Sequence, residues 1–110
     1  MVRQRTPPPL TADEVSEALA AMAHPTRLAI LGWLKHPDDF PPQLVPADEV
    51  GVCLKHLQAR AGVSQSTASQ YLAVLHRAGL VTPTRVGQWT HYRRDDARIA
   101  AVADYLAHQA

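Results

Sequence analysis

The sequence of 110 residues contains a single cysteine, few aromatic residues and no long uninterrupted run of apolar residues. One cysteine, Cys53, cannot close a disulfide within the chain, which fits a reducing compartment. A membrane-spanning helix needs roughly 18 consecutive apolar residues, so no span is expected. The basic residues ahead of Pro9 are not followed by an apolar run, which argues against a signal peptide. These absences predict a cytoplasmic protein that does not enter a membrane.

Groups that catalyse common reactions are also missing. The sequence has no nucleophile with a neighbouring base, no carboxylate pair suited to a cleft and no glycine-rich phosphate loop. We therefore predict that the protein is not an enzyme and has no cofactor.

Acidic residues are absent from one long segment, although the formal net charge is only +1. Residues 50–94 contain six Lys and Arg side chains and no Asp or Glu, while both flanking segments are acidic overall. A local positive field of this kind attracts a phosphate backbone whatever the net charge is. Composition alone leaves a solvated basic surface as an equal alternative.

Length and composition predict one compact domain over residues 11–110, preceded by a flexible tail over residues 1–10. Thr11 and Glu14 have the spacing of a capping box, so a first helix is expected over residues 11–23. Pro25 suits the first turn of a second helix. The buried stripe of that helix is expected to consist of Leu28, Leu31 and Leu34, widened by Ile30 and Trp33.

The proline-rich residues 36–48 are predicted to be a loop, with a short strand at residues 50–52. From Leu54 the apolar spacing is helical again. Ser64 is a good N-cap and Gly79 a good stop for a following helix, whose inward stripe is Ala68, Leu72 and Leu75. Two helices joined by a tight glycine-containing turn fit helix-turn-helix geometry.

Residues 80–85 and 89–94 are rich in β-branched and aromatic residues and are predicted to form a hairpin. Pro83 would suit an edge strand. A last helix is expected to begin near Asp95 or Asp96, because carboxylates suit a helix N-terminus. The predicted order is helix, helix, short strand, helix, helix, hairpin, helix, which is a mainly α fold with a small β part (α+β).

The second helix of the helix-turn-helix carries amides and hydroxyls on its outward face. Gln can bond an adenine edge in the major groove, and Ser and Thr can bond bases or phosphates. A basic hairpin can contact the phosphate backbone or the minor groove. We therefore predict that DNA is bound by Ser64, Gln65, Ser66, Thr67, Ser69, Gln70, Arg77, Arg85, Gln88 and Arg93.

Three aromatic or basic residues of the hairpin receive other roles. Arg94 is expected to pair with Asp95 or Asp96, so it ranks below the other arginines as a DNA contact. Trp89 and Tyr92 are expected to pack rather than to stack on bases.

Four stretches carry a recognisable pattern: residues 24–31 (HPTRLAIL), 63–72 (VSQSTASQYL), 78–81 (AGLV) and the hairpin residues 85–92. Together they resemble ArsR-type winged-helix repressors, and the hairpin is similar to the wing of that family. The resemblance runs from about Val15 to Leu106. It implies a winged helix-turn-helix fold and a homodimer that binds a palindromic operator and is released by a small inducer.

The same resemblance implies dimerisation through the first and last helices. The sequence supports this independently, because the last helix has an apolar stripe that no later segment covers. The stripe could pack within the chain, but pairing with a second copy accounts for both terminal helices. A two-fold dimer would place two reading helices one turn of DNA apart. The interface is expected to contain Val15, Leu19, Met22, Ile99, Val102 and Leu106.

The ligand sets of the arsenic-sensing and zinc-sensing relatives are incomplete. The arsenic-type set resembles Cys-x-Cys-x-x-Cys, and here only Cys53 fits, because Lys55 and Gln58 occupy the other two places. A soft thiolate site needs two or three sulfurs. In the zinc-type set Asp96 matches, but Arg98 replaces the histidine. No metal site is therefore expected.

A weaker metal pair remains in the last helix. Asp104 and His108 are one helical turn apart, and they could chelate weakly or form a solvated pair.

Two interpretations of Cys53 stay open. It is a small buried residue ahead of a helix, or it is a thiol near a helix N-terminus with Lys55 close by, whose oxidation would weaken operator binding. The inducer, whether small molecule or oxidant, is unknown. A winged-helix module that binds protein or RNA is the remaining alternative.

Overall fold

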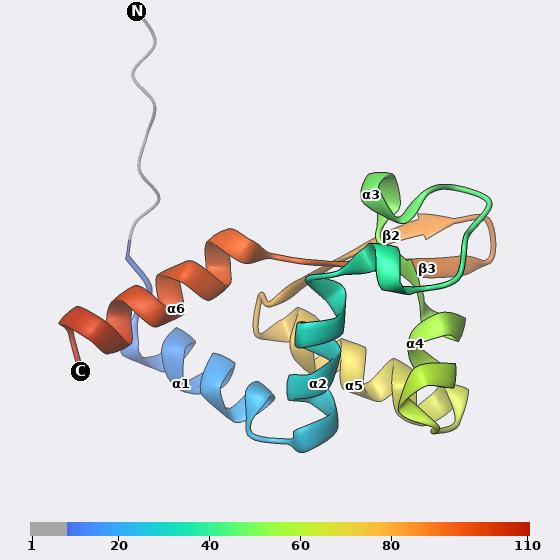
Figure 1. Ribbon diagram of the computed structural model, residues 1–110. Coiled ribbons are helices and arrows are strands. Elements are labelled where there is room, and N and C mark those ends of the chain that lie inside the picture. The colour runs from blue at the N-terminus through green and yellow to red at the C-terminus, as the bar shows by residue number, and fades with distance from the viewer. Residues whose placement is uncertain (1–8) are drawn as a thin grey trace, which may run out of the picture.

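The computed structural model of the chain describes residues 9–110 (Figure 1). Within this range the elements are mainly helical and form a winged helix-turn-helix, which confirms the predicted fold class. Of the predicted flexible tail, residues 1–8 lie outside the described range. Leu10, which was assigned to the tail, packs against the core.

Helix α1 (Ala12–Met22) begins at the predicted capping box. The Thr11 hydroxyl accepts the N–H of Glu14 at 3.1 Å, and the Glu14 carboxylate accepts the N–H of Thr11 at 2.9 Å. Two N–H groups that the helix cannot satisfy itself are thereby bonded, which stabilises this helix start.

The joint between α1 and α2 (Pro25–Leu34) is built from His24 and Arg27. The ring nitrogen Nδ1 of His24 accepts the N–H groups of Thr26 and Arg27 at 3.2 and 3.4 Å, so it caps α2. The Arg27 guanidinium donates from Nε to the carbonyl of Ala21 at 2.7 Å and so closes the end of α1. The His-Pro-Thr-Arg motif is therefore a helix–helix joint.

The buried face of α2 differs in one residue from the prediction. Ile30, Leu31 and Leu34 are buried, but Leu28 is 54% exposed, so its assignment to the buried stripe is wrong. Leu34 follows Ile30 by four residues and Leu31 by three, so it lies on the same face of a 3.6-residue helix as both. Leu28 lies on the flank of that face, where the elements of residues 9–110 leave more than half of it in solvent.

The proline-rich segment contains more structure than the loop that was predicted. It forms a 3-10 turn, η1 (Pro37–Asp39), and the short helix α3 (Ala47–Val50). The predicted strand over residues 50–52 is displaced, because β1 is Val52–Cys53. Gly51 separates α3 from β1 at φ 95°, and a Cβ there would collide with the Tyr92 carbonyl. The strand therefore begins only after this glycine.

The helix-turn-helix consists of α4 (Leu54–Ala61) and α5 (Gln65–Arg77). Gly62 ends α4 in the left-handed conformation at φ 67°, which glycine adopts without strain. The Ser64 hydroxyl caps α5 by accepting the N–H of Thr67 at 3.1 Å. The predicted inward residues of α5, namely Ala68, Leu72 and Leu75, are all buried.

Strands β2 (Val81–Val86) and β3 (Trp89–Arg94) form the antiparallel wing, and β1 pairs with the other edge of β3. The sheet order is β1-β3-β2. Pro83 therefore lies on an edge strand as predicted, where its missing N–H costs no ladder hydrogen bond.

Helix α6 (Asp96–His108) is capped by Asp95, whose carboxylate accepts the N–H of Arg98 at 2.9 Å. Figure 1 shows α6 running beside α1 at one end of the molecule, while the wing lies at the opposite end. Of the helix-turn-helix, α4 lies at the wing's end of the molecule, and α5 runs from there toward the terminal helices (Figure 1). This arrangement separates the terminal helices from the wing.

One cluster of buried side chains holds these elements together. Its largest fully buried members are Ile30, Val52, Leu57, Leu72, Leu75 and Leu80. Burial of each such side chain is worth about 1.5–3 kcal/mol. No helix within residues 9–110 is long and apolar enough to cross a membrane.

Candidate nucleic-acid interface

The outward face of α5 is polar and uncharged. Gln65, Ser66, Ser69 and Gln70 are exposed, as the sequence predicts, while the opposite face of the helix lies in the core. The four side chains are thus held on a rigid helix with their amide and hydroxyl groups in solvent. Such groups can donate to and accept from the edges of nucleic-acid bases.

The hydroxyls of Ser64 and Thr67, at the start of α5, contact each other, and that of Ser64 also contacts the helix backbone. Ser64 Oγ accepts the N–H of Thr67 and lies 3.0 Å from Thr67 Oγ1. Thr67 is half-buried. Two of the predicted contact residues, Ser64 and Thr67, therefore stabilise the start of the helix. The four predicted contact residues on the outward face of α5 have their side chains in solvent.

The wing exposes three of the predicted contact residues. Arg85, Gln88 and Arg93 are exposed, and Arg85 Nε donates to the Gly87 carbonyl at 3.0 Å. This hydrogen bond holds one guanidinium close to the wing tip and leaves its remaining N–H groups for a partner. Arg77, in the last turn of α5, is exposed as well.

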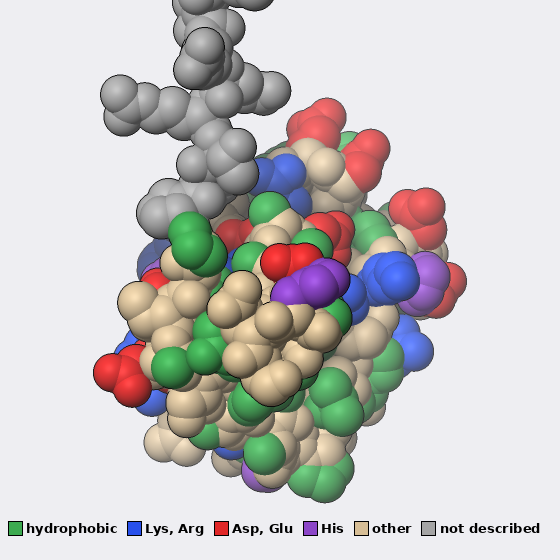
Figure 2. Space-filling view, turned by 90° about the vertical axis from the view of Figure 1, so that its left-hand side faces the viewer, with side chains coloured by type: hydrophobic (Ala, Val, Ile, Leu, Met, Phe, Trp, Pro, Cys, Tyr) green, Lys and Arg blue, Asp and Glu red, His purple; other side chains and the backbone are tan. Residues whose placement is uncertain are grey.

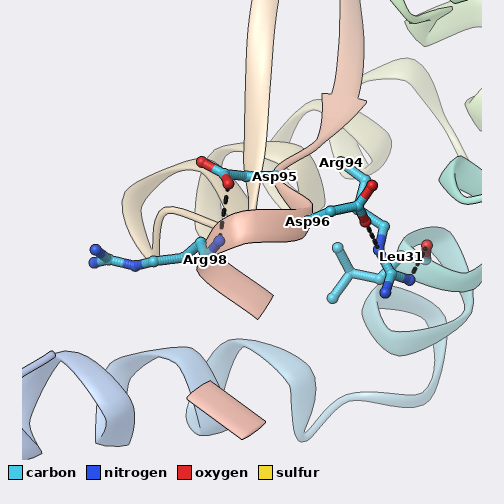
Figure 3. Close-up of polar contacts among 5 residues, drawn as sticks. All are labelled: Leu31, Arg94, Asp95, Asp96 and Arg98. Atoms are coloured by element: carbon cyan, nitrogen blue, oxygen red, sulfur yellow. Dashed lines mark hydrogen bonds and ion pairs between the residues drawn. The ribbon is translucent and has the colours of Figure 1, made fainter. Parts of the chain in front are cut away.

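Arg94 belongs to the fold rather than to this exposed set. Its Nε lies 2.7 Å from Asp96 Oδ1, and its Nη1 donates to the Leu31 carbonyl at 3.2 Å (Figure 3). The predicted pairing of Arg94 with a neighbouring aspartate is confirmed. Its charge is balanced, and the side chain ties α2 to the beginning of α6.

Two further basic residues lie over aromatic rings, which the sequence did not indicate. The Arg60 guanidinium lies 4.9 Å from the Trp33 ring and 5.1 Å from the Phe40 ring. Lys55 Nζ lies 5.7 Å from the Trp89 ring. Cation–π contacts orient a side chain without removing its charge. No spacing in the sequence could signal them, because their partners come from other segments.

The residues predicted for a dimer interface fall into two groups. Val15 and Val102 are buried within the chain's own core, where they join α1 and α6. Leu19 and Leu106 remain 39% and 43% exposed, and Met22 and Ile99 are half-buried. Figure 2 shows this end of the molecule, with apolar side chains spread over the face and most Lys, Arg, Asp and Glu nearer its margin.

The residues of α6 that the sequence suggested as parts of a metal-ligand set either pair within the chain or lie in solvent. Asp96 is paired with Arg94. His108 Nδ1 lies 3.1 Å from Asp104 Oδ1 on the exposed end of α6. Among residues 9–110, no three His, Cys, Asp or Glu side chains are grouped so that they could hold a metal ion.

Cys53 is 3% exposed, which agrees with the buried interpretation. Its backbone N–H donates to Gln43 Oε1 at 2.7 Å. Gln43 was not singled out in the sequence, and the only signal for it was the unexplained length of the proline-rich segment.

No family model matches the chain. The chain is 41% identical over 95 residues to an uncharacterized HTH-type transcriptional regulator, YbzH, of Bacillus subtilis, and the match covers 84% of this chain and 95% of that protein. It is 34% identical over 103 residues to the HTH-type transcriptional repressor SmtB of Mycobacterium tuberculosis, covering 93% of this chain and 67% of that one.

One solved structure with a similar fold is a fragment from Mycobacterium bovis. It is described as the homodimeric winged helix-turn-helix DNA-binding domain of a possible ArsR-family transcriptional regulator. The TM-score is 0.60 and the sequence identity 25%, and the match covers 89% of this chain and 85% of that chain.

Proposed function

The chain belongs to the ArsR/SmtB family of helix-turn-helix transcriptional regulators, and on this premise we propose that it is a cytoplasmic repressor that binds a palindromic operator in duplex DNA as a homodimer. The observation that supports this most strongly is the exposed polar face of α5. That face lies within residues 50–94, which contain no carboxylate side chain to repel phosphate.

We assign base reading to the outward residues of α5. Gln65 and Gln70 each carry an amide that can form a bidentate contact with adenine in the major groove, and Ser66 and Ser69 can bond bases or phosphates. The capped start of α5 directs backbone N–H groups outward, which suits a phosphate near Ser64.

Phosphate contacts fall to the basic residues that have no ion pair among residues 9–110. These basic residues are Arg85 and Arg93 in the wing and Arg77 in α5. To them we add Gln88, an uncharged residue at the wing turn. Their contribution is positional and independent of base sequence, so it weakens with added salt. Arg94 has no such role, because Asp96 balances it.

The homodimer is supported by the apolar residues left exposed on the terminal helices and by the homodimeric state of the similar M. bovis domain. Two-fold symmetry would place the two α5 helices in successive major grooves, about 34 Å apart. A small inducer would release the protein from DNA. Cys53 is the chain's only cysteine and is 3% exposed, so we propose a small molecule rather than an oxidant as the signal.

Selection of duplexes from a random library by the full chain tests this proposal. The expected product is a two-fold symmetric site with half-sites one helical turn apart, bound by two chains, with an affinity that falls steeply as salt rises. Enrichment of no duplex sequence, or tighter binding of single-stranded RNA of the same length, would contradict it.

A further inference from the structure

A cavity of about 190 Å³ lies between the proline-rich segment and the part of the wing next to its turn. One wall comes from residues 42–45, of which three are apolar and one is Gln43, and the others come from β1, the first turn of α4 and the wing strands. The polar and aromatic groups that line it are Cys53, Lys55, His56, Trp89 and His91. The cavity thus joins the longest irregular segment of the chain to two elements of the DNA-binding unit.

Hydrogen bonds of Gln43 connect the wall formed by residues 42–45 to the rest of the fold. Its amide nitrogen donates to the carbonyls of Val45 and Gly51 at 3.1 and 2.8 Å, and its oxygen accepts the Cys53 N–H at 2.7 Å. The segment is therefore pinned to β1 by one side chain. In the sheet Cys53 pairs with His91 on β3, which places both beside this wall.

Two histidines at the cavity each have a ring nitrogen without a hydrogen-bond partner among the described residues. His91 is 7% exposed, and its Nδ1 is buried without a hydrogen-bond partner among the described residues. The Nδ1 of His56 is buried and unpartnered in the same sense. Buried polar atoms nearly always have a partner, since an unmade hydrogen bond is costly. Both nitrogens are closed off from solvent, so a group in the cavity would reach them only after the surrounding side chains moved.

The charges at the cavity are of one sign. Lys55 Nζ lies over the Trp89 ring, and among residues 9–110 no carboxylate pairs with it. Burial, and then the positive charges of Lys55 and His91, hold the pKa of His56 below its ordinary value of 6.5. A neutral imidazole keeps one N–H donor, so a cation and imidazole donors surround a space that is otherwise apolar and aromatic.

We propose that this cavity binds a small aromatic carboxylate, with its ring against Trp89 and the apolar residues of the wall formed by residues 42–45, and its carboxylate between Lys55 and the imidazoles. The volume suits one substituted ring, because a cavity of roughly 150 Å³ accepts benzene. The carboxylate would supply the acceptor that the Lys55 ammonium lacks among residues 9–110, and charge-assisted hydrogen bonds are the strong ones.

A bound anion would also weaken DNA binding, a consequence that rests on the proposed function. It would neutralise Lys55, which belongs to the acid-free segment, and it would place negative charge beside the turn end of the wing. Repulsion of phosphate and a weaker positive field in this segment both lower affinity for a duplex. The occupied cavity is thus a candidate inducer site.

Calorimetry with benzoate, on the full chain without DNA, tests the cavity itself. We expect one benzoate per chain, bound at least about 10-fold more tightly than the neutral benzamide, because a charge-assisted bond is lost with the amide. Lys55→Met should remove this preference. Lys35→Met, which alters the only other lysine, should retain it. No binding of benzoate, as for a cavity that holds only water, or equal binding of the two ligands, would overturn the proposal.

Fluorescence anisotropy with the selected duplex tests the coupling separately. Benzoate should raise the dissociation constant of the wild type several-fold and leave that of Lys55→Met unchanged. An unchanged affinity of the wild type, with benzoate bound, would overturn the inducer role. Failure to bind any duplex would count against the proposed function alone, because the calorimetric result stands without DNA.

Discussion

The guanidinium of Arg98 on α6 lies 3.3 Å from the carboxylate of Glu14 on α1, although 84 residues separate the two in sequence. Glu14 also closes the capping box at the start of α1. On its other side the guanidinium lies against Gly79, where a Cβ would come within 2.8 Å of Arg98 Nε. One carboxylate therefore links a helix cap to the contact between the terminal helices.

The charge of Glu14 should make stability depend on pH in the acid range. Hydrogen bonds from Thr11, and then the charge of Arg98, hold the pKa of Glu14 below its ordinary value of 4.5. The fold thus favours the deprotonated form, and this part of the stability is complete above pH 4.5 and is lost as the pH falls below it. Urea unfolding at a series of pH values measures this. The free energy of unfolding of Glu14→Gln should fall less with acid than that of the wild type.

A glutamine at this position retains the hydrogen-bond acceptor of a capping box, so the substitution removes only the charge. Glu17→Gln, on an exposed part of the same helix, is the matched control and should follow the wild type. If Glu14→Gln loses stability with acid as steeply as the wild type, the link between Glu14 and Arg98 contributes nothing.

Arg85 and Arg94 are arginines of the same hairpin with different predicted effects. Arg85→Ala should weaken binding to all duplexes alike and lower the salt slope by about 1, because one phosphate contact is lost. Arg94→Ala should leave the slope unchanged, since Asp96 already balances that charge. Titrations at several salt concentrations measure both slopes, and equal slopes in the two variants would refute the assignment.

Leu106 is the most exposed of the apolar residues expected at the dimer interface. Leu106→Glu should shift the protein from dimer to monomer in sedimentation equilibrium, because a carboxylate would be buried without a partner. Leu44→Glu makes the same change at a fully exposed leucine of the proline-rich segment and should remain dimeric. A dimeric Leu106→Glu would place the interface elsewhere.

Local signals predicted the ends of the helices well. The caps at Thr11 and Ser64 depend on residues three positions away, so the sequence alone contains the whole interaction. The outward face of α5 was predicted for the same reason, because a strong apolar period on one side determines the other side.

Features that depend on distant partners could not be predicted in this way. Leu28 has the spacing of a buried residue, but its exposure is decided by which neighbours cover the flank of α2. Gln43 acquires its role from carbonyl and N–H groups up to ten residues away. The cavity beside it needs four segments to come together, and only the presence of the long segment was visible in the sequence.

The central claim is that the exposed face of α5 reads base sequence, and Gln70→Ala tests it most directly. Affinities of the variant for the selected duplex and for single-base-pair changes of it should show that one base preference is lost. Its cost on the selected duplex should be about 1–3 kcal/mol if the contact is bidentate. Gln109→Ala, which removes the same group after the end of α6, should keep the wild-type preferences. If Gln70→Ala binds every duplex as the wild type does, α5 does not read DNA through this face.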